Sequence, residues 1–180
     1  SSHRYPMYSL SNTYTKDEII KWEERILKIL GNDITISFSC ELKFDGASIN
    51  LTYKEGELVK ALTRGDGLKG DEITENIKTI KTIPLSLKGE YPKFFEVRGE
   101  IILPIKDFNK MNMQRAELGE ALYSNPRNTA SGSLKLQDSS QVARRPLKCF
   151  IYSVVGDELN LYDQSEVLKK AREWGFVVPN

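Results

Sequence analysis

The stretch ASINLTYKEGELVKALT, residues 47–63, is the part of the sequence that decides the fold. Apolar and polar residues alternate over Ala47–Tyr53 and again over Glu57–Thr63, and Lys54-Glu55-Gly56 between them suits a tight turn. Ile34–Cys40 alternates in the same way. Because a period of two belongs to strands with one buried face, the sequence predicts an antiparallel meander over these three segments.

Helical periodicity occurs on both sides of this meander. Thr15 and Glu18 form a capping box ahead of an apolar repeat that Gly31 ends. Pro104 is predicted at the first position of another helix. The buried stripe of that helix would contain Ile105, Phe108, Met111 and Leu118. Two more helices and two more strands are predicted at Asp71–Lys81, Gln164–Trp174, Phe94–Leu103 and Leu147–Val155. The fold class is therefore α+β, with antiparallel sheets flanked by helices.

The bulk composition excludes several classes of protein. Of the 180 residues, 39% are hydrophobic and 28% are charged, which is too apolar for a disordered chain. The apolar runs are too short to span a membrane. Two cysteines far apart predict neither a disulfide framework nor a zinc site. The net charge of +1 argues against a polycation, although Arg127–Lys148 is locally basic and could face phosphates or simply solvent.

The segment Glu41-Leu42-Lys43-Phe44-Asp45-Gly46 is the first candidate for chemistry. In an element of period two, Glu41, Lys43 and Asp45 would share one face. That face could be a solvated strand edge. It could also present Lys43 as a nucleophile, which would need a neutral amine. Gly46 would let the backbone turn close to a ligand.

Three further segments carry polar groups, and the pattern in each segment alone is weak evidence for a function. Thr63-Arg64-Gly65-Asp66-Gly67, followed by Gly70, is a glycine-rich loop without the spacing of a P-loop or a dinucleotide fingerprint. Glu96, Arg98 and Glu100 share a strand face, which could be a surface ladder of charges. Asn125-Pro126-Arg127-Asn128 is predicted as a turn that leads into small residues.

Taken together and in this order, these segments resemble one family. Lys43-Phe44-Asp45-Gly46 is similar to the lysine motif of the covalent nucleotidyltransferases, which comprise DNA ligases, RNA ligases and mRNA capping enzymes. The flanking segments resemble those of the bacterial NAD-dependent DNA ligases over nearly the whole chain. These segments are Pro6–Asn12, Thr63–Gly67 with Thr74 and Asn76, Arg98-Gly99-Glu100, Asn125–Asn128, and Arg145-Pro146-Leu147 with Phe150 and Tyr152.

The resemblance implies a reaction and a role for each candidate residue. Lys43 would attack NAD and retain AMP, which then passes to the 5′-phosphate of a nick in double-stranded DNA. Asp45 would orient Lys43 or a Mg²⁺ ion. The adenine side would be bound by Ser9, Leu10 and Glu41 and by stacking on Tyr152, and Arg64 and Glu100 would contact the ribose and phosphates. Arg127 would contact DNA phosphate. Lys135 would do so too, but it keeps only the charge and not the planar bidentate contact of the arginine that the family usually has there.

The resemblance also implies an architecture and a cellular setting. It implies two packed antiparallel sheets with the nucleotide between them, in the nucleotidyltransferase-like fold of DNA ligases and capping enzymes. Residues 1–180 would be a partial adenylation domain, incomplete for full activity. An upstream nicotinamide-binding module and downstream OB-fold, zinc-finger, helix-hairpin-helix and BRCT domains would lie outside it. We expect a monomer in the bacterial cytoplasm, associated with the nucleoid and not with a membrane.

Two other functions are compatible with parts of the sequence. An ATP-dependent ligase or capping enzyme would share the lysine motif but would not be expected to share the Ser9-Leu10 segment or the Asn125–Leu134 segment. A non-catalytic nucleic-acid-binding module would be expected to have a stronger basic bias.

Overall fold

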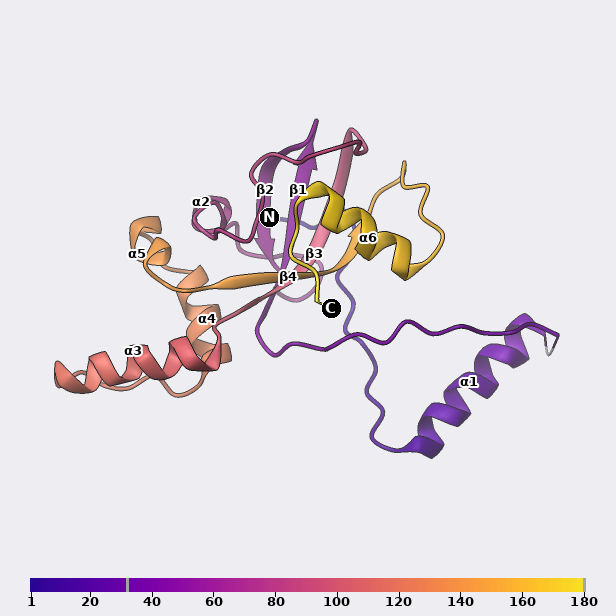
Figure 1. Ribbon diagram of the computed structural model, residues 1–180, viewed down its shortest axis with the longest axis horizontal. Helices are drawn as coiled ribbons and strands as arrows, with labels where there is room; N and C mark the ends of the chain where they lie inside the picture. The colour runs from indigo at the N-terminus through magenta and orange to yellow at the C-terminus, as the bar shows by residue number, and fades with distance from the viewer. Residues whose placement is uncertain (32, 180) are drawn as a thin grey trace. The chain divides into compact units, whose positions relative to one another are not determined.

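The computed structural model describes residues 1–31 and 33–179 (Figure 1). The chain forms two compact units, which are considered separately below. The larger unit combines Ser1–Met7 with Glu41–Asn180, and the smaller unit is Tyr8–Cys40. Within the described residues, no helix is long and apolar enough to cross a membrane.

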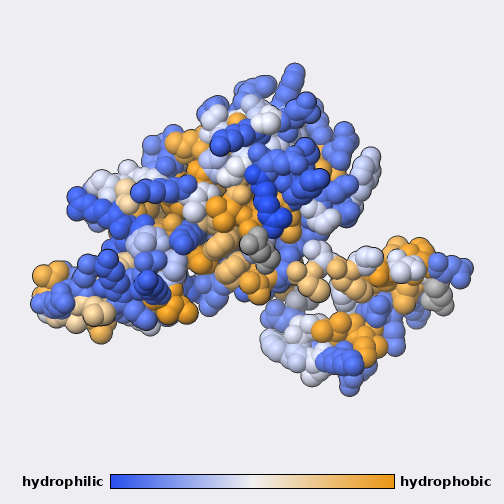
Figure 2. All heavy atoms as spheres, in the orientation of Figure 1, coloured by the Kyte–Doolittle hydropathy of each residue, from blue (hydrophilic) through white to orange (hydrophobic). Residues whose placement is uncertain are grey.

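The smaller unit contains one helix, α1 (Lys16–Leu30), and an extended segment after it. The capping box is confirmed, because Thr15 and Glu18 each accept a hydrogen bond from the other's backbone N–H. No residue of α1 is fully buried, and Figure 2 shows apolar side chains at the surface of this unit. The strand predicted at Ile34–Cys40 is wrong. These residues pair with no strand. Instead, the Phe38 ring packs against the Trp22 ring of α1, with 5.2 Å between the ring centroids.

The larger unit is built on one four-stranded antiparallel sheet of order β2-β1-β3-β4. Its strands are β1 (Ala47–Lys54), β2 (Glu57–Thr63), β3 (Phe94–Ile102) and β4 (Lys148–Val155). The predicted hairpin is confirmed, and both Glu55 and Gly56 have positive φ, at 49° and 81°. This left-handed pair matches the twist of the two strands. The α+β class is confirmed, but the residues described here form one sheet and not the two that the family resemblance implied.

The two faces of the sheet differ in chemistry because adjacent residues of a strand point to opposite sides. On one face, the β1–β3 pairs are Ile49 with Gly99, Leu51 with Val97, and Tyr53 with Phe95. This face is the centre of the hydrophobic core, and its non-glycine members are fully buried. On the other face, the pairs are Ser48 with Glu100, Asn50 with Arg98, and Thr52 with Glu96. Polar residues therefore occupy three successive pairs on the second face, and Phe94 opposite Lys54 is the apolar residue beside them.

Helices pack around the sheet and fix its ends. α6 (Gln164–Trp174) lies against β4, and α4 (Pro126–Leu134) contacts β3 and β1. The prediction for α6 is confirmed, and Gly175, in the left-handed conformation, ends the helix. α2 is shorter than predicted, because Thr74–Ile77 alone is helical within Asp71–Lys81.

The chain between β3 and β4 differs most from the predictions. α3 (Ile105–Glu117) starts one residue after Pro104, which is the N-cap and not the first helical residue. Of its predicted stripe, Phe108 and Met111 pack on the core, whereas Ile105 and Leu118 are exposed. α4 and the short α5 (Ser139–Ala143) were not predicted.

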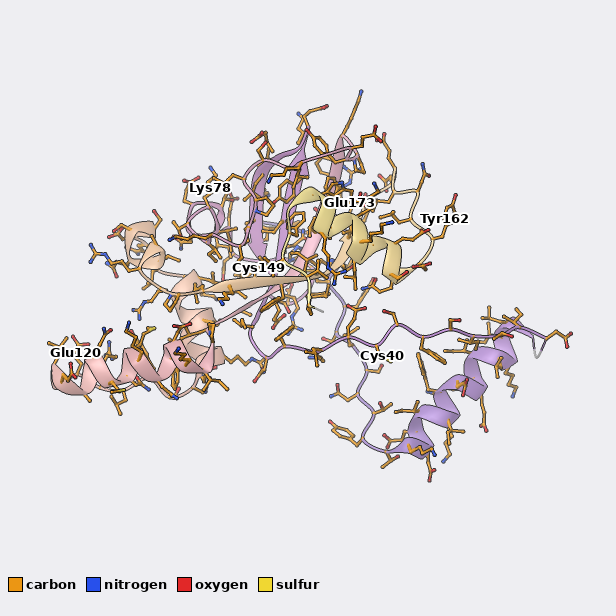
Figure 3. All side chains as sticks on the ribbon, viewed as in Figure 1. Cys40, Lys78, Glu120, Cys149, Tyr162 and Glu173 are labelled. Atoms are coloured by element: carbon orange, nitrogen blue, oxygen red, sulfur yellow. The ribbon has the colours of Figure 1, made fainter. Side chains whose placement is uncertain are left out.

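Both cysteines are free, and the sequence predicted no disulfide framework. Cys40 is exposed in the smaller unit, and Cys149 is buried on β4 (Figure 3). Burial raises the pKa of the Cys149 thiol well above its usual value, and the nearby Glu100 carboxylate raises it further.

Candidate functional site

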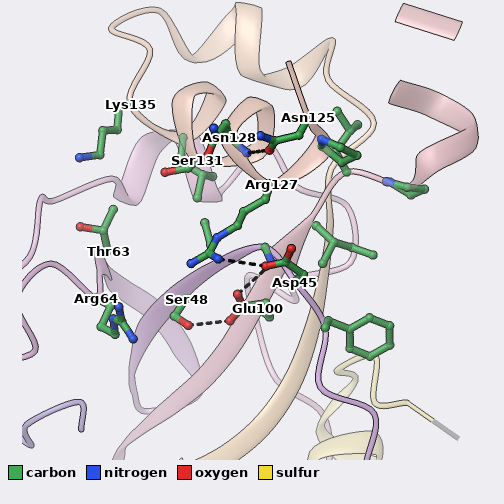
Figure 4. Close-up of a pocket in the computed structure, with 18 of the residues that line it drawn as sticks. Asp45, Ser48, Thr63, Arg64, Glu100, Asn125, Arg127, Asn128, Ser131 and Lys135 are labelled. Carbon is green, nitrogen blue, oxygen red and sulfur yellow. Dashed lines mark hydrogen bonds and ion pairs between the residues drawn. The ribbon is translucent and has the colours of Figure 1, made fainter. Parts of the chain in front are cut away.

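A pocket of about 1220 Å³ opens where β1 begins and where β2 and β3 end (Figure 4). Antiparallel pairing brings the start of β1 and the ends of β2 and β3 together at the same end of the sheet. The N-terminal half of α4 lines the opposite side of the pocket. The polar and charged lining residues are Lys43, Asp45, Ser48, Thr63, Arg64, Glu100, Asn125, Arg127, Asn128, Ser131 and Lys135.

The turn that carries Lys43 is fixed by its neighbours and not by a strand. Residues 41–45 lie outside any strand, so the predicted period-two element with three charges on one face is wrong. Phe44 stacks on Phe150 of β4, with 4.4 Å between ring centroids and 9° between planes. A Cβ at Gly46 would overlap the carbonyl oxygen of Ile101, so only glycine allows this approach to β3. Lys43 itself is exposed at the pocket.

The Glu100 carboxylate holds this turn from the side of β3. One of its oxygens accepts a hydrogen bond from the Gly46 N–H at 3.1 Å, and the other accepts one from Ser48 Oγ at 2.6 Å. Burial raises the pKa of Tyr152 on β4, and the nearby Ser48 lowers it by a smaller amount. Ser48, Glu100 and Gly46 therefore form one connected network from β3 to the start of β1.

The opposite side of the pocket is shaped by the start of α4. The Asn125 side chain accepts a hydrogen bond from the Asn128 N–H at 2.7 Å, and Pro126 occupies the first turn. This cap directs Arg127 toward Asp45, and the two form an ion pair at 3.2 Å (Figure 4). Both side chains are more than half exposed, so the pair adds little to stability. The predicted DNA contact and the predicted orienting carboxylate thus meet in one pocket.

Other predicted residues have different surroundings. Lys135 forms an ion pair with Asp71 at 2.8 Å and holds the pKa of Asp71 below its usual value. Tyr152 is half-buried on β4 and is not among the residues that line the pocket. Glu41 is exposed and does not line the pocket. Ser9 and Leu10 belong to the smaller unit, where both are exposed.

Sequence reasoning missed Ser48 as a site residue. Nothing in the sequence marks Ser48, because the relevant signal is its register opposite Glu100, which exists only once β1 and β3 have paired. The motif residue Asn76 also acquires a structural explanation. Its side-chain amide donates to the carbonyls of Leu134 and Leu136, at 2.8 and 2.7 Å, and so fixes the C-terminal end of α4.

The chemistry of the pocket suits an organic phosphate. Lys43, Arg64, Arg127 and Lys135 supply positive charge around one cavity, and Ser48 and Thr63 supply hydroxyl groups. The described residues include no group of three or more His, Cys, Asp or Glu that could hold a metal ion. The two acids of the pocket are already engaged, Asp45 by Arg127 and Glu100 by Gly46 and Ser48. The site is therefore a cationic, lysine-bearing pocket whose charges and hydroxyl groups suit a phosphorylated ligand.

Comparison with known proteins identifies the family. The family model for the NAD-dependent DNA ligase adenylation domain matches residues 1–180. The chain belongs to this family. It is 60% identical over 179 residues to a DNA ligase of Flavobacterium johnsoniae, covering 99% of this chain and 27% of that protein. DNA ligases of Flavobacterium psychrophilum and Christiangramia forsetii are each 58% identical over 177 residues, covering 98% of this chain and 26% of each relative. The chain thus spans about a quarter of the length of these relatives.

Proposed function

We propose that this chain is the part of an NAD-dependent DNA ligase in which Lys43 becomes covalently adenylated. The observation that carries the proposal is the position of Lys43 at the mouth of a cationic pocket, on a turn held by Glu100 through Gly46 and Ser48. Membership of the adenylation-domain family supports the same reaction. The DNA ligase names of the relatives agree with it.

The chemical step needs a neutral amine and an accessible α-phosphorus. Lys43 Nζ would first lose a proton, and its lone pair would then form a P–N bond as the P–O bond to nicotinamide mononucleotide breaks. The second proton leaves the nitrogen as the phosphoramidate forms. Arg64, which lines the pocket, would stabilise the negative charge on the phosphate oxygens.

The adenosine part of NAD would be bound by the remaining predicted residues. The raised pKa of Tyr152 keeps its ring neutral, which suits stacking on a purine. Glu100 would contact the ribose while it holds the lysine turn. We retain Ser9, Leu10 and Glu41 as proposed contacts for the adenine on the basis of the family resemblance.

Magnesium has less support than NAD. The pocket offers Asp45 and Glu100 as carboxylates, and both already have partners. The described part of the chain contains no carboxylate cluster of the kind that holds a metal by protein ligands alone. We therefore derive no step of the reaction through Mg²⁺.

Nicked double-stranded DNA is the proposed acceptor of the AMP. Arg127 and Lys135 lie along the pocket and belong to the basic segment Arg127–Lys148, whose charge suits DNA phosphates. The ion pairs of these two side chains with Asp45 and Asp71 are exposed, so a phosphate can compete for each cation at small cost. We propose a monomeric enzyme that acts in the bacterial cytoplasm.

The test is self-adenylation of the complete ligase with labelled NAD or labelled ATP. Lys43→Ala and Lys43→Arg are both expected to abolish the adduct, because alanine has no amine and the guanidinium of arginine has no free lone pair. Lys54→Ala, at an exposed lysine outside the pocket, is the matched control and should leave the adduct unchanged.

Each alternative function has its own outcome in this experiment. An adduct formed from ATP and not from NAD would favour the ATP-dependent relatives. Absence of any adduct in the wild-type enzyme would favour a binding module. An undiminished adduct on the Lys43→Ala protein would overturn the assignment of the nucleophile.

A further inference from the structure

We propose that His3 is a positioning residue that holds Arg64 in the nucleotide pocket. The inference rests on the proposed function, in which Arg64 contacts the nucleotide. It concerns a segment that the proposed reaction does not use, Ser1–Met7, which we call the N-terminal strap. The strap belongs to the larger unit, and it lies beside the loop Arg64–Gly70 that follows β2.

The strap and the loop are joined by backbone hydrogen bonds along their length. The His3 N–H donates to the Leu68 carbonyl and the Met7 N–H donates to the Gly67 carbonyl, both at 2.9 Å. Ser2 and Lys69 form an antiparallel β-bridge next to the His3 contact. The strap therefore runs as an added strand along the loop, and the loop cannot move without breaking these bonds.

The other side of the strap is anchored to the polar face of the sheet. The Arg98 guanidinium donates to the carbonyls of Tyr5 and Pro6, at 3.0 and 2.9 Å. The Tyr5 hydroxyl donates to Asp157 at 2.8 Å. Met7 is buried. These contacts connect the loop to β3, the central strand that also carries Glu100.

The glycines of the loop have a specific role in this packing. A Cβ at Gly67 would lie 2.8 Å from the Met7 carbonyl oxygen. A Cβ at Gly70 would overlap the Thr63 carbonyl oxygen and lie 3.2 Å from His3 Nε2. Gly67 allows the strap to approach, and Gly70 allows the loop to pass close to the Thr63 carbonyl of β2, with His3 beside it. The glycine-rich sequence is thus explained by contact within the chain, without invoking a phosphate.

The His3 ring contacts the residue that the loop carries into the pocket. Its Nε2 lies 3.0 Å from the Arg64 carbonyl oxygen, and since a carbonyl only accepts, Nε2 is the protonated nitrogen. The same oxygen accepts from the Gly67 N–H at 3.0 Å, and the Arg64 N–H donates to the Ser48 carbonyl at 3.0 Å. The backbone of Arg64 is therefore held from both sides, by β1 and by the strap.

Fixing the Arg64 backbone has a consequence for binding. Arg64 lines the pocket near Ser48 and Thr63 (Figure 4). A long side chain loses rotamer freedom when it binds a phosphate, and a fixed backbone limits the further entropy that must be lost. Loss of the His3 contact should therefore weaken nucleotide binding more than it slows the chemical step at Lys43.

The experiment measures KM for NAD and kcat of self-adenylation in the complete ligase. His3→Ala is expected to raise KM about 2- to 10-fold, the effect of losing one hydrogen bond, with a smaller change in kcat. His3→Gln should restore part of the loss, because its amide N–H can reach the same carbonyl. Arg4→Ala, which removes the exposed ion pair with Asp157 and leaves the His3 contact in place, is the matched control and should leave KM unchanged.

A double-mutant cycle with Arg64→Ala decides whether His3 acts through Arg64. In the Arg64→Ala background, His3→Ala is expected to raise KM no further. An equal rise in both backgrounds, or no rise in either, would overturn the proposal. If His3→Ala fails to fold, the His3→Gln variant is run through the same cycle. An unchanged KM for Arg64→Ala alone would overturn this inference while leaving the covalent function, which Lys43→Ala tests, intact.

Discussion

The two faces of the β1–β3 pair are built from alternate residues of the same strands, yet they perform different tasks. Ile49, Leu51 and Tyr53 bury apolar surface on one side. Between them, Asn50 and Thr52 place polar groups on the other. The apolar face is covered by the core, and its polar atoms are few and satisfied, as with the Tyr53 hydroxyl that donates to the Pro84 carbonyl at 2.6 Å.

On the polar face, some buried side-chain atoms lack hydrogen-bond partners within the described structure. Asn50 and Glu96 are buried, and within the described structure Asn50 has no hydrogen-bond partner for either side-chain atom, nor does one oxygen of Glu96. Buried groups of this kind cost stability. The sheet therefore gains stability from its apolar face and loses part of it on the polar face, which also carries the Ser48 and Glu100 side chains at the pocket. Changes on the two faces should therefore have separable effects.

The largest effect is expected on the apolar face. Leu51 is fully buried between strands, so Leu51→Ala should lower the free energy of unfolding by about 2–5 kcal/mol. Leu122→Ala makes the same chemical change at an exposed position and should stay within about 0.5 kcal/mol. Urea denaturation followed by circular dichroism measures both. A small loss for Leu51→Ala would contradict the proposed division of tasks.

Glu100→Gln probes the polar face. The amide keeps one acceptor oxygen but puts an N–H₂ group where the carboxylate accepted a hydrogen bond, from either Gly46 or Ser48. Losing a hydrogen bond to a charged group should slow self-adenylation roughly 10- to 100-fold, with a much smaller change in stability. Glu117→Gln on the exposed side of α3 is the control. Equal activity of the two variants would remove Glu100 from the site.

Arg127→Ala tests how the pocket is shared between nucleotide and DNA. We expect nick sealing to fall more than self-adenylation, because the exposed ion pair with Asp45 contributes little by itself. The slope of DNA affinity against salt concentration should decrease by about one counterion. Arg172→Ala, outside the basic segment, should leave that slope unchanged. If self-adenylation falls as far as sealing, Arg127 belongs to the nucleotide site.

The smallest expected effect concerns the buried thiol of Cys149. Its pKa is raised in the folded protein, so above pH roughly 8.5 the unfolded chain loses this proton first and binds fewer protons than the native state. Its contribution to stability is complete below that pH and declines above it, by at most about 1.4 kcal/mol per pH unit. Cys149→Ala should reduce the fall in unfolding free energy between pH 8 and 10. Cys40→Ala, at the exposed cysteine, should leave that fall unchanged.

Elements set by local signals could be predicted from the sequence. The hairpin at Glu55-Gly56 and helix α6 with Gly175 both depend on residues close together in the chain. The strand predicted at Ile34–Cys40 was wrong because an alternation of apolar and polar residues does not by itself supply a partner strand. For α4, the signals Asn125 and Pro126 were present in the sequence, but Asn125–Asn128 was predicted as a turn, because the small residues that follow show no apolar repeat of a helix.

The candidate site divides in the same way. The lysine turn and the charged residues around it could be singled out from the sequence, and six of the ten predicted site residues line one pocket. These are Lys43, Asp45, Arg64, Glu100, Arg127 and Lys135. The contribution of Ser48 and the meeting of Asp45 with Arg127 could not be predicted, because both depend on the register and packing of distant segments.

The register of β1 against β3 also bears on how the protein is made. The pocket takes its walls from residues as early as Lys43 and as late as Lys135, and Phe150 of β4 supports the lysine turn. A ribosome delivers these segments in order, and contacts between distant segments form slowly. During synthesis, the nucleotide pocket can therefore be completed only after α4 has emerged, and its lysine turn is fully supported only after β4 has joined the sheet. Nucleotide binding by nascent chains of increasing length would accordingly begin late and within a narrow range of lengths.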